Sequence, residues 1–582
     1  MKTARELHAK CWQLTISYWF SREALLAWSL LLAAVSLICG IVFTNLYLNN
    51  WQADFYNQLQ YYSHFGFVHA LANFGIMAGV HILISGYQVF FQMKLQLHWR
   101  TWLTNKYLND WLHNKTYYCM NILPGNTDSP DQRISEDIHC FVSHTLNLFL
   151  GLLKQIATLI AFTIVLWHLS GNLSFSVNQI PLTIPGYLIW AALGYSALGT
   201  WLTTRVGRPL VALNIAQQRY EADFRYLLVR LRENDESIAL SHGERYEKNN
   251  LMNTFHKICD SVQKSINVTK NLTWFTTSYS QFSFVFAFIL ASPRYFNNEI
   301  QLGQLFEISG AYWYVHSALS YIVNSFATIA EWRAVLARLS QFTINMRRTQ
   351  LFLKTEQSLE ISYPASNMLS IKCLNLHCPD RKILLQNFSL HLKPTDKLLI
   401  TGSAGRGKST LLKTLTGIWP FSQGIIHIPA KQKFMLLPQK PYMPLSTLRD
   451  VLIYPGMSTP LSTELLKKTL ILCNLSFLTD KLDQINNWER ILSLGEQQHL
   501  AIARAILHKP DWLLLDEATS ALEEVAELQI YNILQKLLPK TALISVGHRG
   551  TLKKFHTLKL ELDGPGTWRL SSLTDNSYAL HS

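Results

Sequence analysis

The sequence predicts two domains of different fold class: an all-α membrane domain with six helices, followed by an α/β domain of the P-loop NTPase type. Three observations predict this. Long apolar segments are confined to about the first 340 of the 582 residues, and Lys and Arg crowd the stretches between them. The remainder reads as a soluble α/β domain and holds a complete phosphate-binding pattern. We place the membrane domain at residues 1–340, a linker at 341–368 and the α/β domain at 369–582.

Six apolar segments are long enough to cross a bilayer, which takes about 20 residues in a helix. The expected spans are Ala24–Leu48, Phe67–Gln92, Asn147–Ser170, Ile184–Thr204, Leu272–Ser292 and Gln304–Ala330. The loops near 49–66 and 171–183 carry no Lys or Arg, whereas 1–23, 94–146 and 205–271 are basic. Because positive residues favour the cytoplasmic side, we expect both termini and the α/β domain in the cytoplasm.

Composition favours a membrane protein over a nucleic-acid-binding protein. Apolar residues make up 49% of the chain and charged residues 15%, with a formal net charge of +14. A nucleic-acid-binding protein would gather that charge on one face or tail, whereas here it alternates with apolar segments, so no nucleic-acid partner is expected. The eight scattered cysteines form no repeated C-x-x-C and are expected to be free thiols. The first apolar stretch is long and lacks a small-residue cleavage site, so no cleavable signal peptide is predicted.

The pattern G-x-x-x-x-G-K-[ST] is complete in one segment between a strand-like run, 397–400, and a helix-like run that begins at Thr410. Its members are Gly402, Ser403, Ala404, Gly405, Arg406, Gly407, Lys408 and Ser409. The glycines let the backbone wrap around phosphate oxygens, and the N–H groups up to Thr410 favour negative charge. Lys408 would reach the β- and γ-phosphates, and the Ser409 hydroxyl would bind Mg²⁺. The segment therefore predicts a site for ATP and Mg²⁺.

Three further segments place polar groups after apolar, strand-like runs. Gln439 follows one such run and would contact Mg²⁺ and the attacking water. Asp516 and Glu517 end another, where Asp516 would hold Mg²⁺ through water and Glu517 would orient or deprotonate the hydrolytic water. His548 ends the last and would sense the γ-phosphate. Taken singly, each group has an ordinary alternative as a solvent-facing strand end, a structural histidine or a loop residue.

A fifth segment, Leu492–Gln498, opens a helix with Ser493, Gly495 and Glu496 at its start, where backbone N–H groups suit an anion. The order of P-loop, Gln loop, L-S-x-G-E-Q signature, Asp-Glu pair and His loop resembles the ATPase domain of ABC transporters over about residues 370–560. In that family, the signature of one domain completes the site formed by the P-loop of another. The resemblance therefore implies a two-fold homodimer, with twelve spans lining one pathway for a solute in the bilayer.

The membrane half resembles one branch of that family. The segments concerned are Asp131–Ile138, Glu221–Arg225 and Leu231–Ala239, together with Pro438–Pro444 and Thr447–Arg449 of the α/β domain. They are similar to the fused permease–ATPase half-transporters of subfamily D, which include peroxisomal fatty-acyl transporters, and to the bacterial branch that includes SbmA/BacA-like peptide-uptake permeases and a cobalamin and peptide importer. This resemblance implies an exporter-type ABC transmembrane fold and ATP-driven transport of a peptide, a cobalamin-like solute or another hydrophilic or amphipathic cargo in a bacterial inner membrane.

Four positions depart from the family pattern. No aromatic residue stands near Cys378 to stack on adenine, Leu494 replaces a common Gly, His499 a common Arg and Glu523 a common Asp. Two alternatives stay open beside the leading hypothesis: a proton-driven permease with a regulatory ATPase domain, and export of acyl-CoA or lipid. A soluble ATPase acting on ribosomes or DNA is excluded by the six spans.

The direction of transport stays open as well. The ionisable residues in or beside the spans are His81, Lys154, Glu307 and His316, and none is singled out as a substrate ligand.

Overall fold

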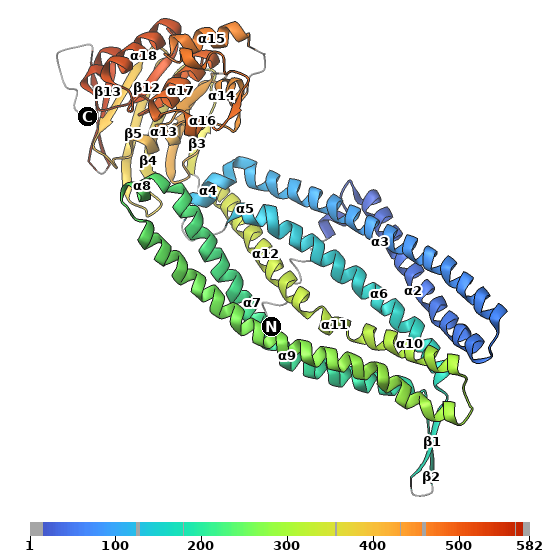
Figure 1. Ribbon diagram of the computed structural model, residues 1–582. Coiled ribbons are helices and arrows are strands. Elements are labelled where there is room, and N and C mark those ends of the chain that lie inside the picture. Colours follow the sequence, from blue (N-terminus) through green and yellow to red (C-terminus); the bar gives the residue numbers. More distant parts are fainter. Residues whose placement is uncertain are drawn as a thin grey trace. The chain divides into compact units, whose positions relative to one another are not determined.

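The computed structural model describes residues 16–123, 129–177, 180–355, 358–430, 432–456, 461–564 and 566–573. The chain forms two compact units (Figure 1). The helical unit comprises Met1–Asp110 and Asp128–Ile344, and the α/β unit comprises Trp111–Thr127 and Asn345–Ser582.

The helical unit is built from long helices that run alongside one another (Figure 1). They are α2 (Ala24–Gln60), α3 (His64–Leu112), α6 (Ile138–Ser170), α7 (Tyr187–Glu233), α9 (Glu244–Phe296), α10 (Leu302–Leu319), α11 (Tyr321–Asn324) and α12 (Phe326–Thr355), with the short α5 (Pro130–Gln132), a π-helical turn η2 (Arg133–Asp137) and α8 (Asp235–Leu240) between them. The basic stretch 205–271 is almost wholly helical. An antiparallel hairpin of β1 (Asn172–Val177) and β2 (Ile180–Pro185) precedes α7.

Three helical stretches are long and apolar enough to cross a membrane, as judged by length and composition over the described part of the chain. They are Ala24–Gln60, His64–Ile122 and Pro130–Ser170, and they contain the first three expected spans. The fourth to sixth expected spans also lie in helices, but not in ones that meet this criterion. The expected start of the fourth at Ile184 is wrong: Ile184 belongs to β2, and α7 begins only after Gly186, whose φ of 65° suits a turn. The sixth is divided among α10, α11 and α12.

Two main sheets and one two-stranded pair of short strands lie in the described part of the α/β unit. The larger has the strand order β14-β13-β6-β12-β11-β8 and the smaller β3-β7-β4-β5. Their bounds are β3 (Ser358–Ser362), β4 (Leu369–His377), β5 (Ile383–Leu392), β6 (Lys397–Gly402), β7 (Ser422–His427), β8 (Phe434–Leu437), β11 (Trp512–Asp516), β12 (Ala542–Val546), β13 (Leu558–Gly564) and β14 (Thr567–Ser572). Strands β13, β6, β12, β11 and β8 are parallel to one another, and β14 is antiparallel to β13. The carboxyl ends of β6, β8, β11 and β12 therefore meet at one edge, where such sheets bind ligands.

Helices and short elements complete this unit. They are η1 (His113–Lys115), α4 (Thr116–Ile122), α13 (Lys408–Leu415), β9 (Ser446–Thr447), α14 (Leu448–Ile453), α15 (Thr463–Leu472), η3 (Ser476–Leu478), β10 (Ile485–Asn486), α16 (Trp488–Ile491), α17 (Leu494–His508), α18 (Glu524–Leu537) and η4 (Gly550–Phe555). Every residue of β11 and β12 is buried, as expected of strands covered on both faces. Strand β3 pairs in parallel with β7, so residues 341–368 hold the end of α12 and a strand of the smaller sheet.

The α/β unit also takes in a segment from far earlier in the chain. In α4, Thr116, Cys119 and Met120 are buried, and the preceding Lys115 Nζ lies 3.4 Å from the carbonyl oxygen of Thr416. The seven cysteines among the described residues are free, as expected, while Cys11 lies outside them.

Candidate nucleotide site

The P-loop joins β6 to α13 and needs glycine at three positions. Gly402, Gly405 and Gly407 have φ values of 139°, 77° and 88°, which L side chains rarely adopt. A Cβ atom at Gly402 would lie 2.6 Å from the carbonyl oxygen of Leu562, and one at Gly407 would lie 3.1 Å from the Cβ of Leu384. The loop is therefore held close to its neighbours with its conformation preset, as a phosphate-binding loop requires.

Lys408 is buried at the start of α13, with 6% of its surface exposed. Its Nζ donates hydrogen bonds to the carbonyl oxygens of Gly402 and Ser403, at 2.7 and 3.1 Å. Both acceptors are neutral, so the positive charge of the ammonium group is not cancelled by them. The arrangement leaves a buried cation inside the loop, which suits a bound anion.

Ser409 and Asp516 bring two oxygen groups together beside the P-loop. The Ser409 hydroxyl donates to Asp516 Oδ1 at 2.7 Å, although 107 residues separate them in the chain. Burial raises the pKa of Asp516; the hydrogen bond from Ser409 opposes this rise, and the adjacent Glu517 adds to it. Asp516 is thus a buried carboxylate beside a hydroxyl group and a second carboxylate. Together these oxygen groups form a donor set that fits a hard divalent cation.

Glu517 and His548 follow the neighbouring strands β11 and β12. His548 Nε2 lies 3.6 Å from Glu517 Oε1. Glu517 has a φ of 51°, a left-handed conformation that is costly for a residue with a side chain and that recurs where geometry serves function. The structure thus brings together Glu517, predicted to orient or deprotonate the hydrolytic water, and His548, predicted to sense the γ-phosphate.

The signature segment forms the N-terminus of α17. The Ser493 hydroxyl accepts a hydrogen bond from the Glu496 N–H at 3.3 Å, and Glu496 Oε2 accepts one from the Ser493 N–H at 2.8 Å. This reciprocal capping box fixes the first turn of the helix. At Gly495 an added Cβ would lie 3.5 Å from a methyl group of Leu522, so the glycine packs close to the segment after Glu517.

Sequence reasoning missed Gln498, which is fully buried behind the site. Its Nε2 donates to the Gln439 carbonyl oxygen at 2.9 Å, and its Oε1 accepts from the Ala521 N–H at 3.1 Å. One side chain therefore ties the Gln439 loop to the segment after Glu517. The signal in the sequence that could have pointed to Gln498 was the pair of glutamines directly after Glu496. The Gln439 side chain itself is exposed.

Two of the departures from the family pattern have structural counterparts. Trp419 donates to the His377 carbonyl oxygen at 3.0 Å and is only 9% exposed, so this ring near Cys378 is packed away. His499 is buried in α17, and burial lowers its pKa, so a neutral imidazole stands where the family commonly has a charged guanidinium.

The chain matches the family model "ABC transporter transmembrane region 2" over residues 12–296 and the model "ABC transporter" over residues 385–520. It is 32% identical over 571 residues to the Escherichia coli inner membrane ABC transporter ATP-binding protein YddA, which spans 98% of this chain and 97% of that relative. The chain belongs to the ABC transporter family. This ABC transporter is also 30% identical to the chloroplastic ABC transporter D family member 2 of Arabidopsis thaliana, over 96% of this chain and 86% of the relative.

A solved structure of a bacterial Atm1-family ABC exporter with ATP bound matches the fold. The TM-score is 0.67 at 17% sequence identity, with 94% of this chain and 95% of that chain covered. The ABC transporter is therefore an exporter-type half-transporter, with a transmembrane domain fused to an ATPase domain whose ATP hydrolysis is coupled to transport. The family, the fold class and the ATPase activity predicted from the sequence are confirmed.

Proposed function

We propose that this transporter works as a two-fold homodimer in a bacterial inner membrane, with each ATP held between the P-loop of one copy and the signature of its partner. The observation that carries the proposal is the sheet edge at which Lys408, Ser409, Asp516, Glu517 and His548 converge. The α/β unit supplies one such edge and one signature, so a symmetric pair of chains would provide two complete sites. The name of the Escherichia coli relative supports the inner-membrane location.

In this proposal, the phosphates of the substrate ATP lie along the backbone of the P-loop, with Lys408 at the β- and γ-phosphates. Ser409, Asp516 and Gln439 would hold Mg²⁺, which would neutralise phosphate charge when bound. Arg406 is half-buried on the loop, where its Nε lies 3.4 Å from the Ser403 hydroxyl. The remaining P-loop and signature residues would contribute backbone N–H groups.

Glu517 orients the hydrolytic water in this proposal, and His548 positions Glu517. In this proposal the imidazole, 3.6 Å from the Glu517 carboxylate, would also contact the γ-phosphate of bound ATP. ATP binding would hold two α/β units together, and hydrolysis would release them, so that the helical units alternate between two access states. The α/β units and both termini would face the cytoplasm, where ATP is available.

The test compares full-length wild type with Glu517→Gln in proteoliposomes, measuring ATP hydrolysis and solute uptake together. General-base loss lowers rates by roughly 10²- to 10⁴-fold, so both should fall by about that factor. Glu524→Gln removes an exposed carboxylate from the first turn of α18 and is the matched control. Uptake that persists in Glu517→Gln and follows a proton gradient would contradict ATP-driven transport.

The homodimer is tested separately by disulfide cross-linking. The double variant Ser403→Cys/Ser493→Cys, in a Glu517→Gln background with ATP, should give a band of twice the chain mass under non-reducing conditions. Either single cysteine variant should give none. A cross-link confined to one chain would contradict the shared site.

A further inference from the structure

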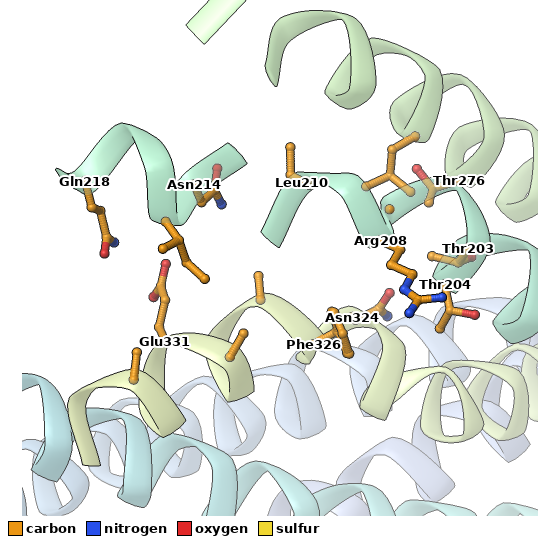
Figure 2. Close-up of a pocket in the computed structure, with 16 residues that line it drawn as sticks. Thr203, Thr204, Arg208, Leu210, Asn214, Gln218, Thr276, Asn324, Phe326 and Glu331 are labelled. Atoms are coloured by element: carbon orange, nitrogen blue, oxygen red, sulfur yellow. The ribbon is translucent and has the colours of Figure 1, made fainter. Parts of the chain in front are cut away.

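A cavity of about 280 Å³ lies in the helical unit between α7, α9, α11 and α12 (Figure 2). This volume is near the lower end of the range typical of small-molecule sites. It suits a ligand much smaller than a corrinoid. The cavity is used by none of the groups assigned above to ATP.

One end of the cavity carries a cation among hydroxyl and amide groups. Figure 2 shows the Arg208 guanidinium beside Thr203, Thr204 and Asn324, with Thr276 across from them. No carboxylate of the described residues pairs with Arg208. A guanidinium that lines a cavity without an acidic partner is free to form a bidentate pair with a carboxylate of a ligand.

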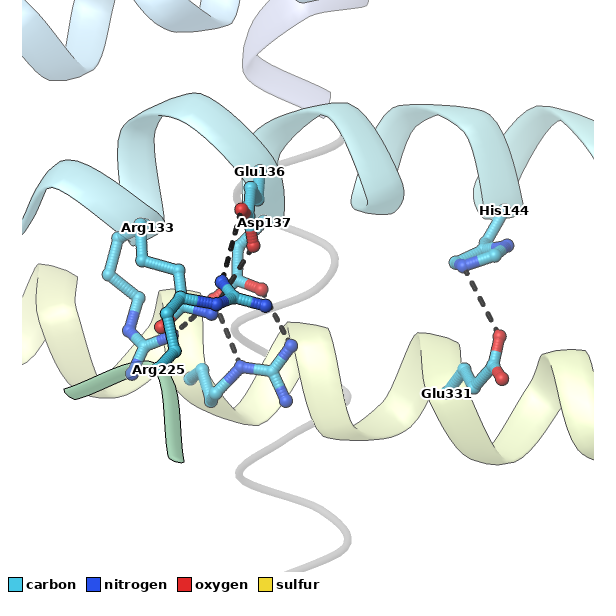
Figure 3. A network of polar contacts seen from close by, with 8 residues as sticks. Arg133, Glu136, Asp137, His144, Arg225 and Glu331 are labelled. Atoms are coloured by element: carbon cyan, nitrogen blue, oxygen red, sulfur yellow. Dashed lines mark hydrogen bonds and ion pairs between the residues drawn. The ribbon is translucent and has the colours of Figure 1, made fainter. Parts of the chain in front are cut away.

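The other end of the cavity carries an acid. Glu331 on α12 faces Asn214 and Gln218 of α7 across the cavity (Figure 2). Its side chain is 49% exposed, and one of its carboxylate oxygens lies 3.7 Å from Nε2 of His144 (Figure 3). A contact of this length to a histidine leaves the carboxylate able to accept hydrogen bonds from an ammonium group.

The distance between the two ends follows from helix geometry. Glu331 faces Asn214 and Gln218, which lie six and ten residues beyond Arg208 on α7, or about 9 and 15 Å along the helix axis at about 1.5 Å per residue. An extended peptide spans at most about 3.3–3.6 Å per residue, so about three to four residues bridge the two ends. The wall between the ends is apolar, with Leu210, Ile215 and Ala327 lining it.

We propose that this cavity binds a short zwitterionic peptide of about three to four residues, with its carboxylate at Arg208, its ammonium group at Glu331 and apolar side chains against the wall between them. The proposal names the cargo class of the transport proposed above and rests on it for the role of the site in transport. A phosphatidylethanolamine headgroup carries the same two charges, but only two methylene groups separate its phosphate from its ammonium group, too few to reach both ends.

Equilibrium binding of radiolabelled trileucine to the full-length protein in phosphatidylcholine nanodiscs tests the site. Arg208→Gln should weaken binding by about 10- to 100-fold, because a charge-assisted hydrogen-bonded pair is lost. Arg205→Gln, one turn earlier on the same helix and outside the cavity, is the matched control and should leave the Kd unchanged.

Blocked peptides assign each end. Trileucine amide should bind weakly and be indifferent to Arg208→Gln, while N-acetyl-trileucine should bind weakly and be indifferent to Glu331→Gln. Equal weakening of all three peptides by Arg208→Gln, or tight binding of the doubly blocked peptide, would overturn the assignment.

Two further experiments distinguish the peptide site from a lipid site and from the proposed ATP-driven transport. Replacing phosphatidylcholine by phosphatidylethanolamine should leave trileucine binding unchanged, and competition by that lipid would show a lipid site instead. The Glu517→Gln variant should bind trileucine as tightly as wild type. If trileucine does not bind while ATP-driven transport is intact, only the peptide site in the cavity is overturned. If trileucine binds but transport does not depend on ATP, only the proposed energy source is overturned.

Discussion

The two units hold their polar groups in different ways. At the sheet edge of the α/β unit, the Ser409 hydroxyl donates a hydrogen bond to Asp516. The side-chain amide of Gln498 forms hydrogen bonds with two loops and so joins them. In the cavity of the helical unit, Arg208 has no acidic partner among the described residues. Catalysis benefits from groups fixed before the substrate arrives, because no reorganisation is then needed during the reaction. A transport site must release the ligand that it binds. Polar groups that have no partner within the protein, and that pair only with the ligand, serve that purpose.

One cluster in the helical unit breaks this pattern. Asp137, in the turn η2, accepts hydrogen bonds from Arg338 at 2.6 and 3.0 Å and from Arg133 at 2.7 Å (Figure 3). Only 3% of Asp137 is exposed. It joins η2 to α12, which also contributes Glu331 to the cavity, and thereby gives the helical unit one rigid point.

The largest expected effect comes from breaking that rigid point. Asp137→Asn leaves two guanidinium groups without their buried carboxylate and should cost about 3 kcal/mol, at the low end for buried pairs because Arg338 is partly exposed. The midpoint of thermal unfolding, followed by tryptophan fluorescence in detergent, should fall clearly. Glu136→Gln, which loses only a 4.0 Å exposed pair with Arg225, should leave it nearly unchanged. Equal unfolding midpoints for the two variants would show that the Asp137 cluster stabilises the protein no more than the exposed Glu136–Arg225 pair does.

The second test concerns the rigid edge of the α/β unit. Gln498→Leu keeps the volume but removes both hydrogen bonds, so kcat for ATP should fall by about 10- to 100-fold, equivalent to about 1.4–2.7 kcal/mol. The affinity for ATP should change little, because the P-loop is untouched. Gln529→Leu, on the exposed face of α18, is the control. An unchanged kcat would show that the edge does not depend on this link.

The third test uses pH to titrate one buried group of the α/β unit. His556 is buried, and its ring nitrogens contact the Leu552 carbonyl oxygen at 2.8 Å and the Ser545 hydroxyl at 2.9 Å. Burial lowers its pKa from 6.5 to about 4, so the unfolded chain takes up the proton first as the pH falls. Stability is therefore full above about pH 6.5 and is lost progressively toward pH 4.

Between pH 7.5 and 5.5 this histidine should cost the folded state about 1 kcal/mol, or roughly 2–4 °C in thermal midpoint. His556→Gln cannot titrate and should lose correspondingly less over the same interval. The comparison is made on the full-length protein at both pH values. A larger loss in the variant than in wild type would contradict the assignment.

The smallest effect is expected at an exposed pair beside the site. Lys440 Nζ lies 2.7 Å from Glu489 Oε1, with both side chains largely exposed. Lys440→Ala should change stability by less than about 1 kcal/mol and leave ATP hydrolysis unaltered, although Lys440 follows Gln439 directly. A marked loss of ATP hydrolysis in a coupled-enzyme assay would show that the fixed groups needed for hydrolysis include this exposed pair.

The sequence predicted the α/β unit well because its motifs combine chemistry with backbone requirements. Gly402 and Gly407 stand where only glycine fits, and Asp516 and Glu517 end a wholly buried strand. Gln498 was missed because its two partners come together only in the folded sheet. The start of the fourth span was misplaced at Ile184 because an apolar run rich in β-branched residues suits a strand as well as a helix. Arg208 and Glu331 escaped notice because residues far apart in the chain form that cavity.

The placement of Trp111–Thr127 within the α/β unit has a consequence for biosynthesis. A ribosome delivers this segment before the whole of 128–344, and the strands with which it folds emerge only afterwards. Chains usually fold domain by domain from the N-terminus, but here an early segment must wait, with Cys119 and Met120 still uncovered, until the last third of the chain appears. The α/β unit is thus completed late, by closing a very long loop, and a truncated chain leaves that segment without its partner.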